Sequence, residues 1–139
     1  MSREIKFRVW DKLAERFTKC DEGYQGHYIL SLKGEFHNLQ NGSGGNDYIV
    51  QQWTGLVDKN DVEIYEGDII KYKSYEKWLS DDYHEVNDVV FYNPDRGAFV
   101  HALDPKTFKA GMTFDPYTFD PLEYEVIGNI FENPELLKA

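Results

Sequence analysis

Alternation between apolar and polar residues predicts a β-strand near the start of this chain. Residues 5–9 read Ile5, Lys6, Phe7, Arg8 and Val9. Because successive side chains of a strand point to opposite faces, the three apolar residues share one face, which we expect to lie in a core. Residues 48–53 are also rich in β-branched and aromatic side chains and predict a second strand.

Turn-forming residues between apolar runs predict how further strands connect. The turns lie at residues 33–35, 58–61, 66–68 and 93–97. The first divides a looser strand pair within residues 24–39. The last joins two β-rich runs, residues 89–92 and 98–101, and is the clearest hairpin in the sequence.

Three stretches lack a strand pattern. Residues 41–47 are rich in glycine and asparagine and predict a mobile loop. Residues 73–87 mix aromatic and charged side chains with neither period, so we expect a short helix or an ordered loop there. Residues 103–121 contain three Asp-Pro pairs, which exclude a continuous strand because proline donates no ladder hydrogen bond.

The end of the chain predicts a strand followed by a short helical turn. Residues 124–131 have strand composition, and Asn133 is placed to act as the N-cap of a turn that begins at Pro134 and continues through residues 135–137.

The pattern as a whole predicts a mainly β fold with about seven or eight short strands and little helix, arranged as a barrel or as strongly bent sheets. A length of 139 residues is typical of one domain. We expect amino-terminal strands in residues 1–40, the mobile loop in 41–47 and a barrel-like β region in 48–139.

The charge is acidic and unevenly distributed. The formal net charge is −10 and the sequence pI is about 4.8, which disfavours direct binding to nucleic acid. Residues 1–20 hold six basic and three acidic residues, so they carry +3 and the remainder carries −13. The basic segment is either a solvated strand face or one side of a complementary contact.

Cysteine content and hydropathy bear on location. The single cysteine, Cys20, cannot form an internal disulfide. No apolar run approaches the roughly 20 residues of a membrane helix, and no signal-peptide core follows the charged first residues. We therefore expect a cytoplasmic protein of a bacterial host cell that does not bind membranes.

Three segments together resemble the YopX-like family of small phage and prophage proteins. They are Arg3-Glu4-Ile5-Lys6-Phe7-Arg8-Val9-Trp10-Asp11, residues 53–70 from Trp53 through Glu66-Gly67-Asp68, and residues 124–137 from Tyr124 through Asn133-Pro134. The family typically has Asn-Gly where this chain has Asn60-Asp61, which questions the turn type at that point. The resemblance implies an SH3-like β-barrel element among the bent strands and hairpins, and it supplies no catalytic residues to carry over.

One acidic cluster has the composition of a metal site. Its members are Asp81, Asp82, His84, Glu85 and Asp88. Carboxylate and imidazole groups suit Mg²⁺ or Mn²⁺. The cluster lacks the glycine and the regular ligand alternation of a metal loop, so a solvated acidic loop is the favoured interpretation, and we expect no metal and no cofactor.

Residues in and after the predicted hairpin match the residue types of a nuclease motif but not its expected structure. Pro94-Asp95 followed by Asp104-Pro105-Lys106 resembles the acidic residues and lysine of metal-dependent nucleases. Such a site requires the second acid, Asp104, and Lys106 on one face of a strand. Pro105 lies between them and disfavours a strand there, so the match is interpreted as a coincidence.

Two other sets of residues invite a chemical interpretation. Cys20 and His27 would be a nucleophile and its base, but no third orienting residue is indicated. Residues 42–45, Gly-Ser-Gly-Gly, would cradle a phosphate only if a helix followed, and none is predicted. We therefore expect no catalytic residues.

The 22 aromatic residues exceed the needs of a small core and favour a binding surface. The leading hypothesis is a non-enzymatic phage or prophage accessory protein that binds itself and another host or phage protein. The possible self-association face consists of Arg3, Lys6, Arg8 and Trp10. The alternatives are an acidic DNA mimic that blocks a host nucleic-acid-binding protein and, less favoured, a small metal-dependent nuclease.

Overall fold

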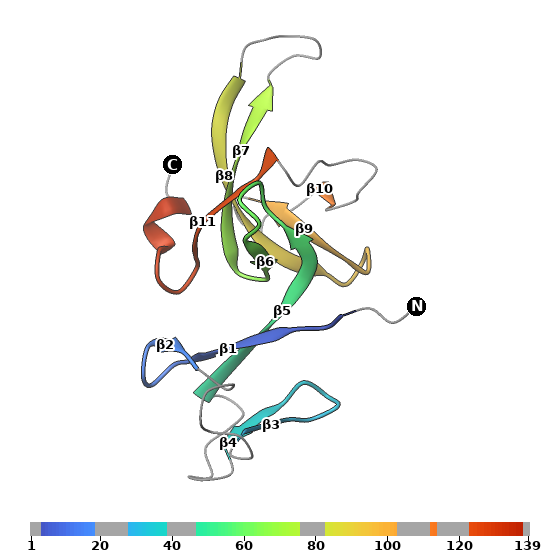
Figure 1. The fold of residues 1–139 in the computed structure, drawn as a ribbon, viewed down its shortest axis with the longest axis vertical. Coiled ribbons are helices and arrows are strands. Elements are labelled where there is room, and N and C mark those ends of the chain that lie inside the picture. Colours follow the sequence, from blue (N-terminus) through green and yellow to red (C-terminus); the bar gives the residue numbers. More distant parts are fainter. Residues whose placement is uncertain are drawn as a thin grey trace. The chain divides into compact units, whose positions relative to one another are not determined.

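The chain forms two compact units, residues 1–52 and residues 53–139, each described by itself (Figure 1). The computed structural model describes residues 4–18, 28–38, 47–75, 83–102, 112–113 and 123–137. The described residues are mainly β-strand and include no α-helix, which confirms the predicted fold class. The SH3-like detail and the single domain stay predictions.

The first unit consists of antiparallel strands. Its elements are β1 (Phe7–Asp11), β2 (Arg16–Phe17), β3 (Tyr28–Leu30), β4 (Phe36–Asn38) and the first half of β5 (Tyr48–Val57). Strand β1 lies between β2 and β5, and β3 pairs with β4 across the turn predicted at residues 33–35. The predicted loop at residues 41–47 falls almost entirely outside the described residues.

The alternation in residues 5–9 predicts the strand correctly but its buried face only in part. Val9 is 5% exposed, whereas Ile5 and Phe7 are 53% and 44% exposed. Trp10, the neighbour of Val9 in sequence, is 8% exposed and packs against Phe17 with ring centroids 5.0 Å apart. Adjacent residues of a strand face opposite sides, so β1 is buried on both faces at Val9 and Trp10, whereas Phe7 at its start is exposed.

The second unit is built on a five-stranded antiparallel sheet. The strand order is β10-β9-β8-β7-β11. Its members are β7 (Asp68–Tyr75), β8 (Tyr83–Asn93), β9 (Ala98–Ala102), β10 (Met112–Thr113) and β11 (Glu125–Asn129). Strand β6 (Glu63–Tyr65) pairs with the second half of β5. The turns predicted at 58–61, 66–68 and 93–97 connect these strands.

The expectation of a helix or loop in residues 73–87 is wrong at both ends of that stretch. Strand β7 continues to Tyr75 and pairs with β8 without interruption, from Ile69 opposite Val89 to Tyr75 opposite Tyr83. Residues 83–85 are exposed, so this part of the hairpin faces solvent and lacks the apolar alternation by which a half-buried strand is recognised. The intervening residues 76–82 lie outside the described residues.

The core of the second unit contains Ile64, Ile70, Val90 and Tyr124, with Leu56, Tyr72 and Val126 packed against them. The final strand ends at Asn129, and a short 3-10 helix, η3 (Pro134–Leu137), follows as predicted. Between residues 103 and 121 only β10 is described, so the prediction about the Asp-Pro segment falls mainly outside the described residues.

Candidate functional site

Asp58 is the most deeply buried carboxylate of the motif segment 53–70. It is 0% exposed. The amides of Asn60 and Val62 donate to Oδ1 at 2.8 and 2.9 Å, and the Val126 amide donates to Oδ2 at 2.8 Å. A carboxylate that accepts three backbone hydrogen bonds compensates for its burial. Asp58 therefore has a structural role.

The Asp58 turn also covers the outer edge of β11. The Lys59 amide donates to the Tyr124 carbonyl at 3.0 Å, beside the contact between Asp58 and Val126. An uncovered strand edge would leave these backbone groups unpaired and open to other chains. The turn thus takes the place of a neighbouring strand.

The polar residues of the carboxyl-terminal motif also hold turns. Asn129 Oδ1 accepts from the amides of Phe131 and Glu132, and Asn133 Oδ1 accepts from the Asn129 amide. A Cβ atom on Gly128 would lie 2.5 Å from Asn133 Oδ1, so glycine is required for this close approach. In the same way, Asp68 Oδ2 accepts from the Tyr65 amide in the turn before β7.

A second group of polar side chains lies in the core. Asp88 Oδ2 accepts from the Tyr72 hydroxyl at 2.9 Å and lies 2.8 Å from His101 Nδ1. Asp88 and His101 are both buried, and the rings of Tyr72, His101 and Tyr124 contact one another edge-on. Mutual hydrogen bonding is what allows such groups to be buried.

Burial raises the pKa of the Tyr72 hydroxyl, and the charge and hydrogen bond of Asp88 raise it further. Burial also raises the pKa of Tyr124, followed by the effects of Tyr72, Glu123 and Asp88. Both phenols therefore stay protonated at neutral pH, which is the opposite of an activated nucleophile.

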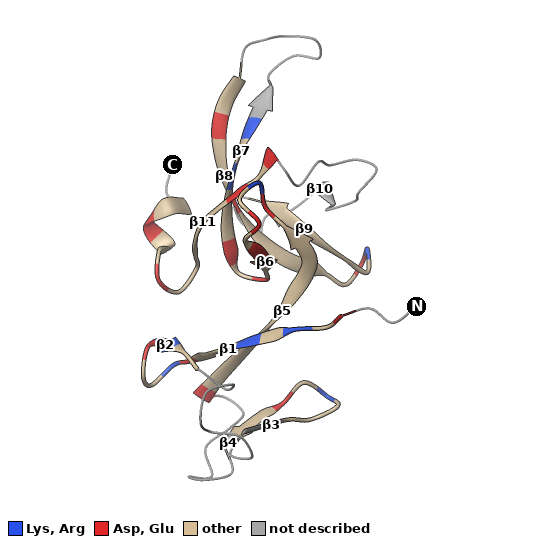
Figure 2. Ribbon diagram, in the orientation of Figure 1, with Lys and Arg blue, Asp and Glu red and all other residues tan. Residues whose placement is uncertain are grey.

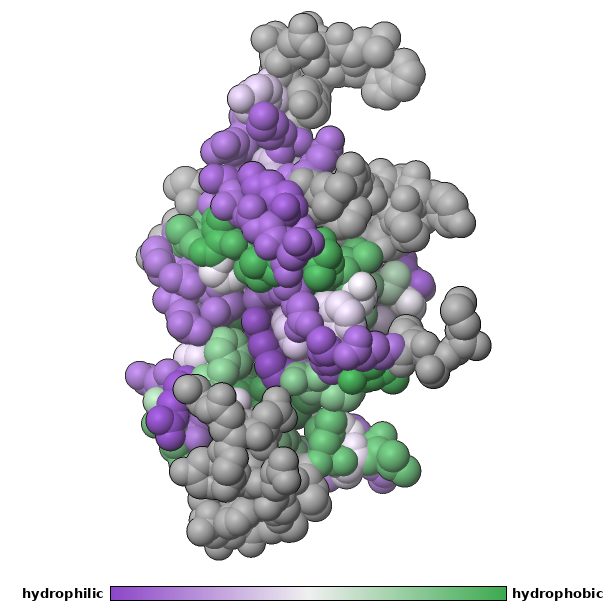
Figure 3. Space-filling model, viewed as in Figure 1, coloured by the Kyte–Doolittle hydropathy of each residue, from purple (hydrophilic) through white to green (hydrophobic). Residues whose placement is uncertain are grey.

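A groove of about 260 Å³ opens on the second unit. Its lining is Lys59, Lys71, Tyr72, Lys73, Glu85, Glu123 and Glu125. Figure 3 shows hydrophilic surface gathered over the part of this unit where β7, β8 and β11 lie. Small-molecule sites are usually larger than about 300 Å³ and mostly apolar, whereas this groove is lined by three lysines, three glutamates and one tyrosine.

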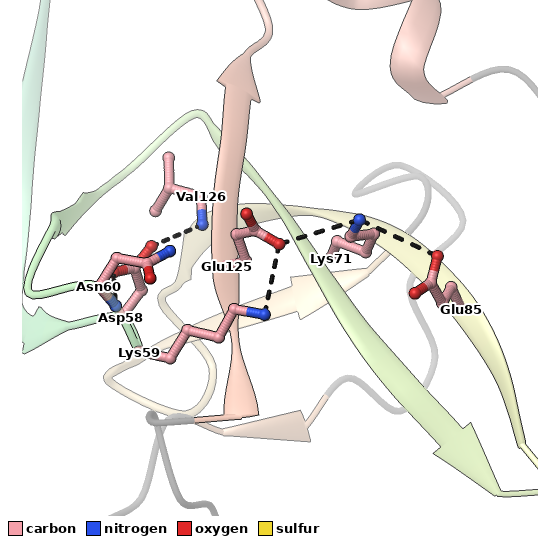
Figure 4. Close-up of polar contacts among 7 residues, drawn as sticks. All are labelled: Asp58, Lys59, Asn60, Lys71, Glu85, Glu125 and Val126. Atoms are coloured by element: carbon pink, nitrogen blue, oxygen red, sulfur yellow. Dashed lines mark hydrogen bonds and ion pairs between the residues drawn. The ribbon is translucent and has the colours of Figure 1, made fainter.

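Four of the groove residues form a row of alternating charge across three strands (Figure 4). The Nζ atom of Lys59 lies 3.4 Å from Glu125 Oε2, and that of Lys71 lies 3.8 Å from the same oxygen and 3.9 Å from Glu85 Oε2. These side chains are partly exposed, and exposed ion pairs contribute only about 0–1 kcal/mol each. The row is neutral overall and weakly held.

The other two charged residues of the groove, Lys73 and Glu123, lie outside this row. The Lys73 ammonium lies 4.3 Å from the centre of the Tyr83 ring, and neither residue forms an ion pair with another described residue. Among the described residues of the groove, one positive and one negative charge therefore lie outside the row.

The residues of the predicted self-association face have different surroundings. Arg3 lies outside the described residues, and Lys6 pairs with Glu4 at 3.5 Å. Arg8 donates from Nε to Gln51 Oε1 at 2.8 Å and lies over the Phe17 ring. Figure 2 shows the basic residues along β1. The Trp10 ring is in the core of the first unit and is not available to a second copy, whereas self-association itself stays a prediction.

The described residues of the possible metal cluster have different surroundings. Asp81 and Asp82 lie outside the described residues, His84 and Glu85 are exposed, and Asp88 is buried against His101. Within the described ranges, no group of three histidine, cysteine or acidic residues is placed to hold a metal ion.

The remaining candidates fall mostly outside the described residues. Asp95 is exposed in the turn between β8 and β9, where its amide donates to Asn93 Oδ1. Residues 104–106, Cys20, His27 and residues 42–45 are not described. The groove was missed by sequence reasoning, although the alternation of Lys71 and Lys73 along β7 was a local signal for it.

Comparison with known proteins agrees with the fold and the motif segments. Within the described residues, no helix has the length and apolar character needed to cross a membrane. No curated protein matches this chain. The crystal structure of protein EF1440 from Enterococcus faecalis is similar, with a TM-score of 0.60 and 28% sequence identity over 99% of this chain and 100% of that one. The family model described as YopX protein matches residues 6–138. The chain therefore belongs to the YopX family.

Proposed function

We propose that this chain is a non-enzymatic protein-binding module of phage or prophage origin that acts in the cytoplasm of a bacterial host. The observation that carries the proposal is the groove on the second unit, whose charged lining includes a lysine and a glutamate, Lys73 and Glu123, that form no ion pair with another described residue. Such a surface suits a partner with both charges.

The buried polar residues support binding over catalysis. Asp58 and Asp68 accept hydrogen bonds from backbone amides in turns. Asp88 and His101 pair with each other beside a tyrosine, Tyr72, whose hydroxyl is held protonated. These contacts give the groups structural tasks, and the Tyr72 hydroxyl, whose pKa is raised, is not an activated nucleophile.

A test is affinity capture from infected or induced host cells with quantitative mass spectrometry. The groove variant carries Lys71→Glu and Lys73→Glu. The control carries Lys12→Glu and Lys33→Glu, two exposed lysines of the first unit, and has the same net charge. We expect a protein that the wild type and the control enrich equally and the groove variant enriches several-fold less. Equal enrichment by all three would contradict the proposal.

The charge distribution favours a second candidate, an acidic mimic of DNA. Residues 1–52 hold seven basic and seven acidic residues, whereas residues 53–139 hold eight basic and 18 acidic residues, so the second unit carries the entire net charge of −10. Figure 2 shows acidic residues distributed over several elements of that unit. A mimic would capture a nucleic-acid-binding protein, and DNA would compete for it. For a groove-bound partner we expect no competition.

A further inference from the structure

The charged row of the groove crosses the sheet in a fixed order. The turn that contains Lys59 lies along the outer edge of β11, β11 pairs with β7, and β7 pairs with β8. From the turn to β8, the row reads Lys59, Glu125, Lys71 and Glu85, so its charges are plus, minus, plus and minus (Figure 4). An alternating row with an even number of members has opposite charges at its two ends.

The strand residues of the row lie on one face of the sheet. Glu125 is directly opposite Lys71, and Lys71 is directly opposite Asn87, which lies two residues along β8 from Glu85. Residues directly opposite each other, and residues two apart on one strand, share a face. This face is turned away from the core residue Ile70, the neighbour of Lys71 in β7.

The two ends of the row are more exposed than its middle. Lys59 and Glu85 are exposed, whereas Glu125 and Lys71 are half-buried. A chain that approaches the groove therefore meets a positive charge on one side and a negative charge on the other. Because the ion pairs within the row are weak, these side chains can turn toward an approaching chain at little cost in free energy.

A second copy of the chain carries the charges that match this row. In a symmetric dimer both copies use the same surface, so the twofold axis lies in the plane of contact. An axis that runs along the strands, between β11 and β7, reverses the order of the row in the second copy. Lys59 then faces Glu85 of the second copy, and Lys71 faces its Glu125. An axis across the strands would instead bring like charges together, so the row selects one orientation.

The same rotation matches the two charged groove residues outside the row. Lys73 follows Lys71 by two residues in β7, and Glu123 precedes Glu125 by two residues. Because β7 and β11 are antiparallel, these two steps lead in the same direction from the pair formed by Lys71 and Glu125. The axis that brings Lys71 and Glu125 together therefore also brings Lys73 of one copy toward Glu123 of the other.

We propose that the groove binds a second copy of this chain in a symmetric dimer, with the twofold axis along β7 and β11 and with Lys59 of each copy facing Glu85 of the other. This inference rests on the proposed function, because it names a partner of the same groove. It places self-association on the second unit, not on the amino-terminal strand. Exposed ion pairs are weak, so the charges select the orientation of the copies and the dimer forms at high concentration.

The test reverses the charge at each end of the row. In Lys59→Glu, and equally in Glu85→Lys, like charges face each other at both ends of the contact between two identical copies. Each variant alone should dimerise about tenfold or more weakly than the wild type. In an equimolar mixture, a dimer of one copy of each variant has opposite charges at both ends, so the mixture should dimerise about as strongly as the wild type. Sedimentation equilibrium in low salt, up to millimolar protein, measures these affinities.

The mixture separates contact between copies from pairing within a chain. Each substitution breaks an ion pair of its own chain, and mixing the two variants does not restore those pairs. Recovery in the mixture therefore reports a contact between position 59 of one copy and position 85 of the other. Lys33→Glu makes the same charge change at an exposed lysine of the first unit, and this control should dimerise as the wild type does.

The outcomes distinguish this inference from the proposed function. A wild type that stays monomeric at millimolar concentration would overturn the symmetric dimer. A mixture that dimerises no more strongly than the single variants would also overturn it, because the contact between copies would then lie elsewhere. Both outcomes leave the capture experiment as the test of the proposed function, which equal enrichment by the wild type, the control and the groove variant would contradict.

Discussion

Asp58 and Glu125 carry the same functional group in neighbouring parts of the second unit, yet their surroundings differ completely. Asp58 is 0% exposed and accepts three backbone hydrogen bonds, whereas Glu125 is partly exposed and meets two lysine side chains at 3.4 and 3.8 Å. Backbone amides fixed around a buried carboxylate interact strongly with it, and flexible ammonium groups in water interact weakly with an exposed one.

This difference shows how the unit divides its polar residues between stability and binding. The motif residues Asp58, Asp68 and Asn129 hold turns by hydrogen bonds to backbone amides. The four residues of the charged row in the groove are joined by weak ion pairs, so a partner can replace those contacts at little cost in free energy. Substitutions in the two regions should therefore have very different effects on stability.

The largest effect is expected for Asp58→Ala. The amides of Asn60, Val62 and Val126 would lose their acceptor, and each buried unsatisfied amide costs about 1–3 kcal/mol. Water can reach the first two residues, which are exposed. We expect the free energy of unfolding to fall by about 3 kcal/mol or more, measured by urea denaturation.

Asp95→Ala is the matched control, because Asp95 is an exposed acid in another turn of the same unit. It should change the free energy of unfolding by less than about 0.5 kcal/mol. If both variants had similar small effects, the described role of Asp58 would be wrong.

The next effect concerns Gly128. Gly128→Ala would place a Cβ atom 2.5 Å from Asn133 Oδ1, and the displaced side chain would lose its contact with the Asn129 amide. We expect a loss of about 1–3 kcal/mol, typical of overpacking. Asn133→Gly removes the obstacle together with the Asn133 Cβ atom, which would lie 2.8 Å from the new Cβ atom, so the double variant should be more stable than the sum of the two single effects predicts. Strict additivity would exclude this clash as the cause.

A smaller effect, in the stabilising direction, is expected at Asp61. This residue has a φ of +62°, in the left-handed region that L-residues adopt at a cost of about 1–2 kcal/mol and glycine adopts freely. Asp61→Gly should raise the free energy of unfolding by up to about 1 kcal/mol. Asp61→Ala should lower it, since alanine has neither glycine's freedom nor a side chain that can hydrogen-bond locally. Stabilisation by both substitutions would show that the backbone conformation is not the cause.

The Asp61 turn also shows what the sequence can predict. The YopX-like family typically has Asn-Gly where this chain has Asn60-Asp61, so the sequence leaves the turn type open. Asp61 has a positive φ, so the turn keeps the backbone conformation that favours glycine, with aspartate at that position. Local turn chemistry likewise predicted the strand pairs around residues 33–35 and 93–97, since those connections depend on residues adjacent in sequence.

Features that depend on distant residues were not predictable in the same way. The row formed by Lys59, Glu125, Lys71 and Glu85 requires the register of three strands from separate parts of the sequence. The hairpin formed by β7 and β8 was missed because its far end is exposed and has no apolar period. Asp88 lies close in sequence to the other residues of the possible metal cluster. The pairing of β7 with β8, however, places Asp88 opposite Ile70, and its side chain lies next to His101 in the core.

The smallest effect is expected in the groove. Lys71 contacts Glu125 at 3.8 Å and Glu85 at 3.9 Å, and its partners are partly exposed, so Lys71→Ala should lower the free energy of unfolding by at most about 1 kcal/mol. Combined with Glu125→Ala in a double-mutant cycle, it should give a coupling energy below about 0.5 kcal/mol that decreases further in 1 M salt, where the screening length is about 3 Å. A coupling energy above about 2 kcal/mol would mean that the row stabilises the fold as Asp58 does. A partner would then lose much of its binding free energy in breaking these ion pairs. If the coupling energy is small and the Lys71→Glu and Lys73→Glu variant no longer captures the partner protein, the groove residues contribute to binding and not to stability, in contrast to Asp58.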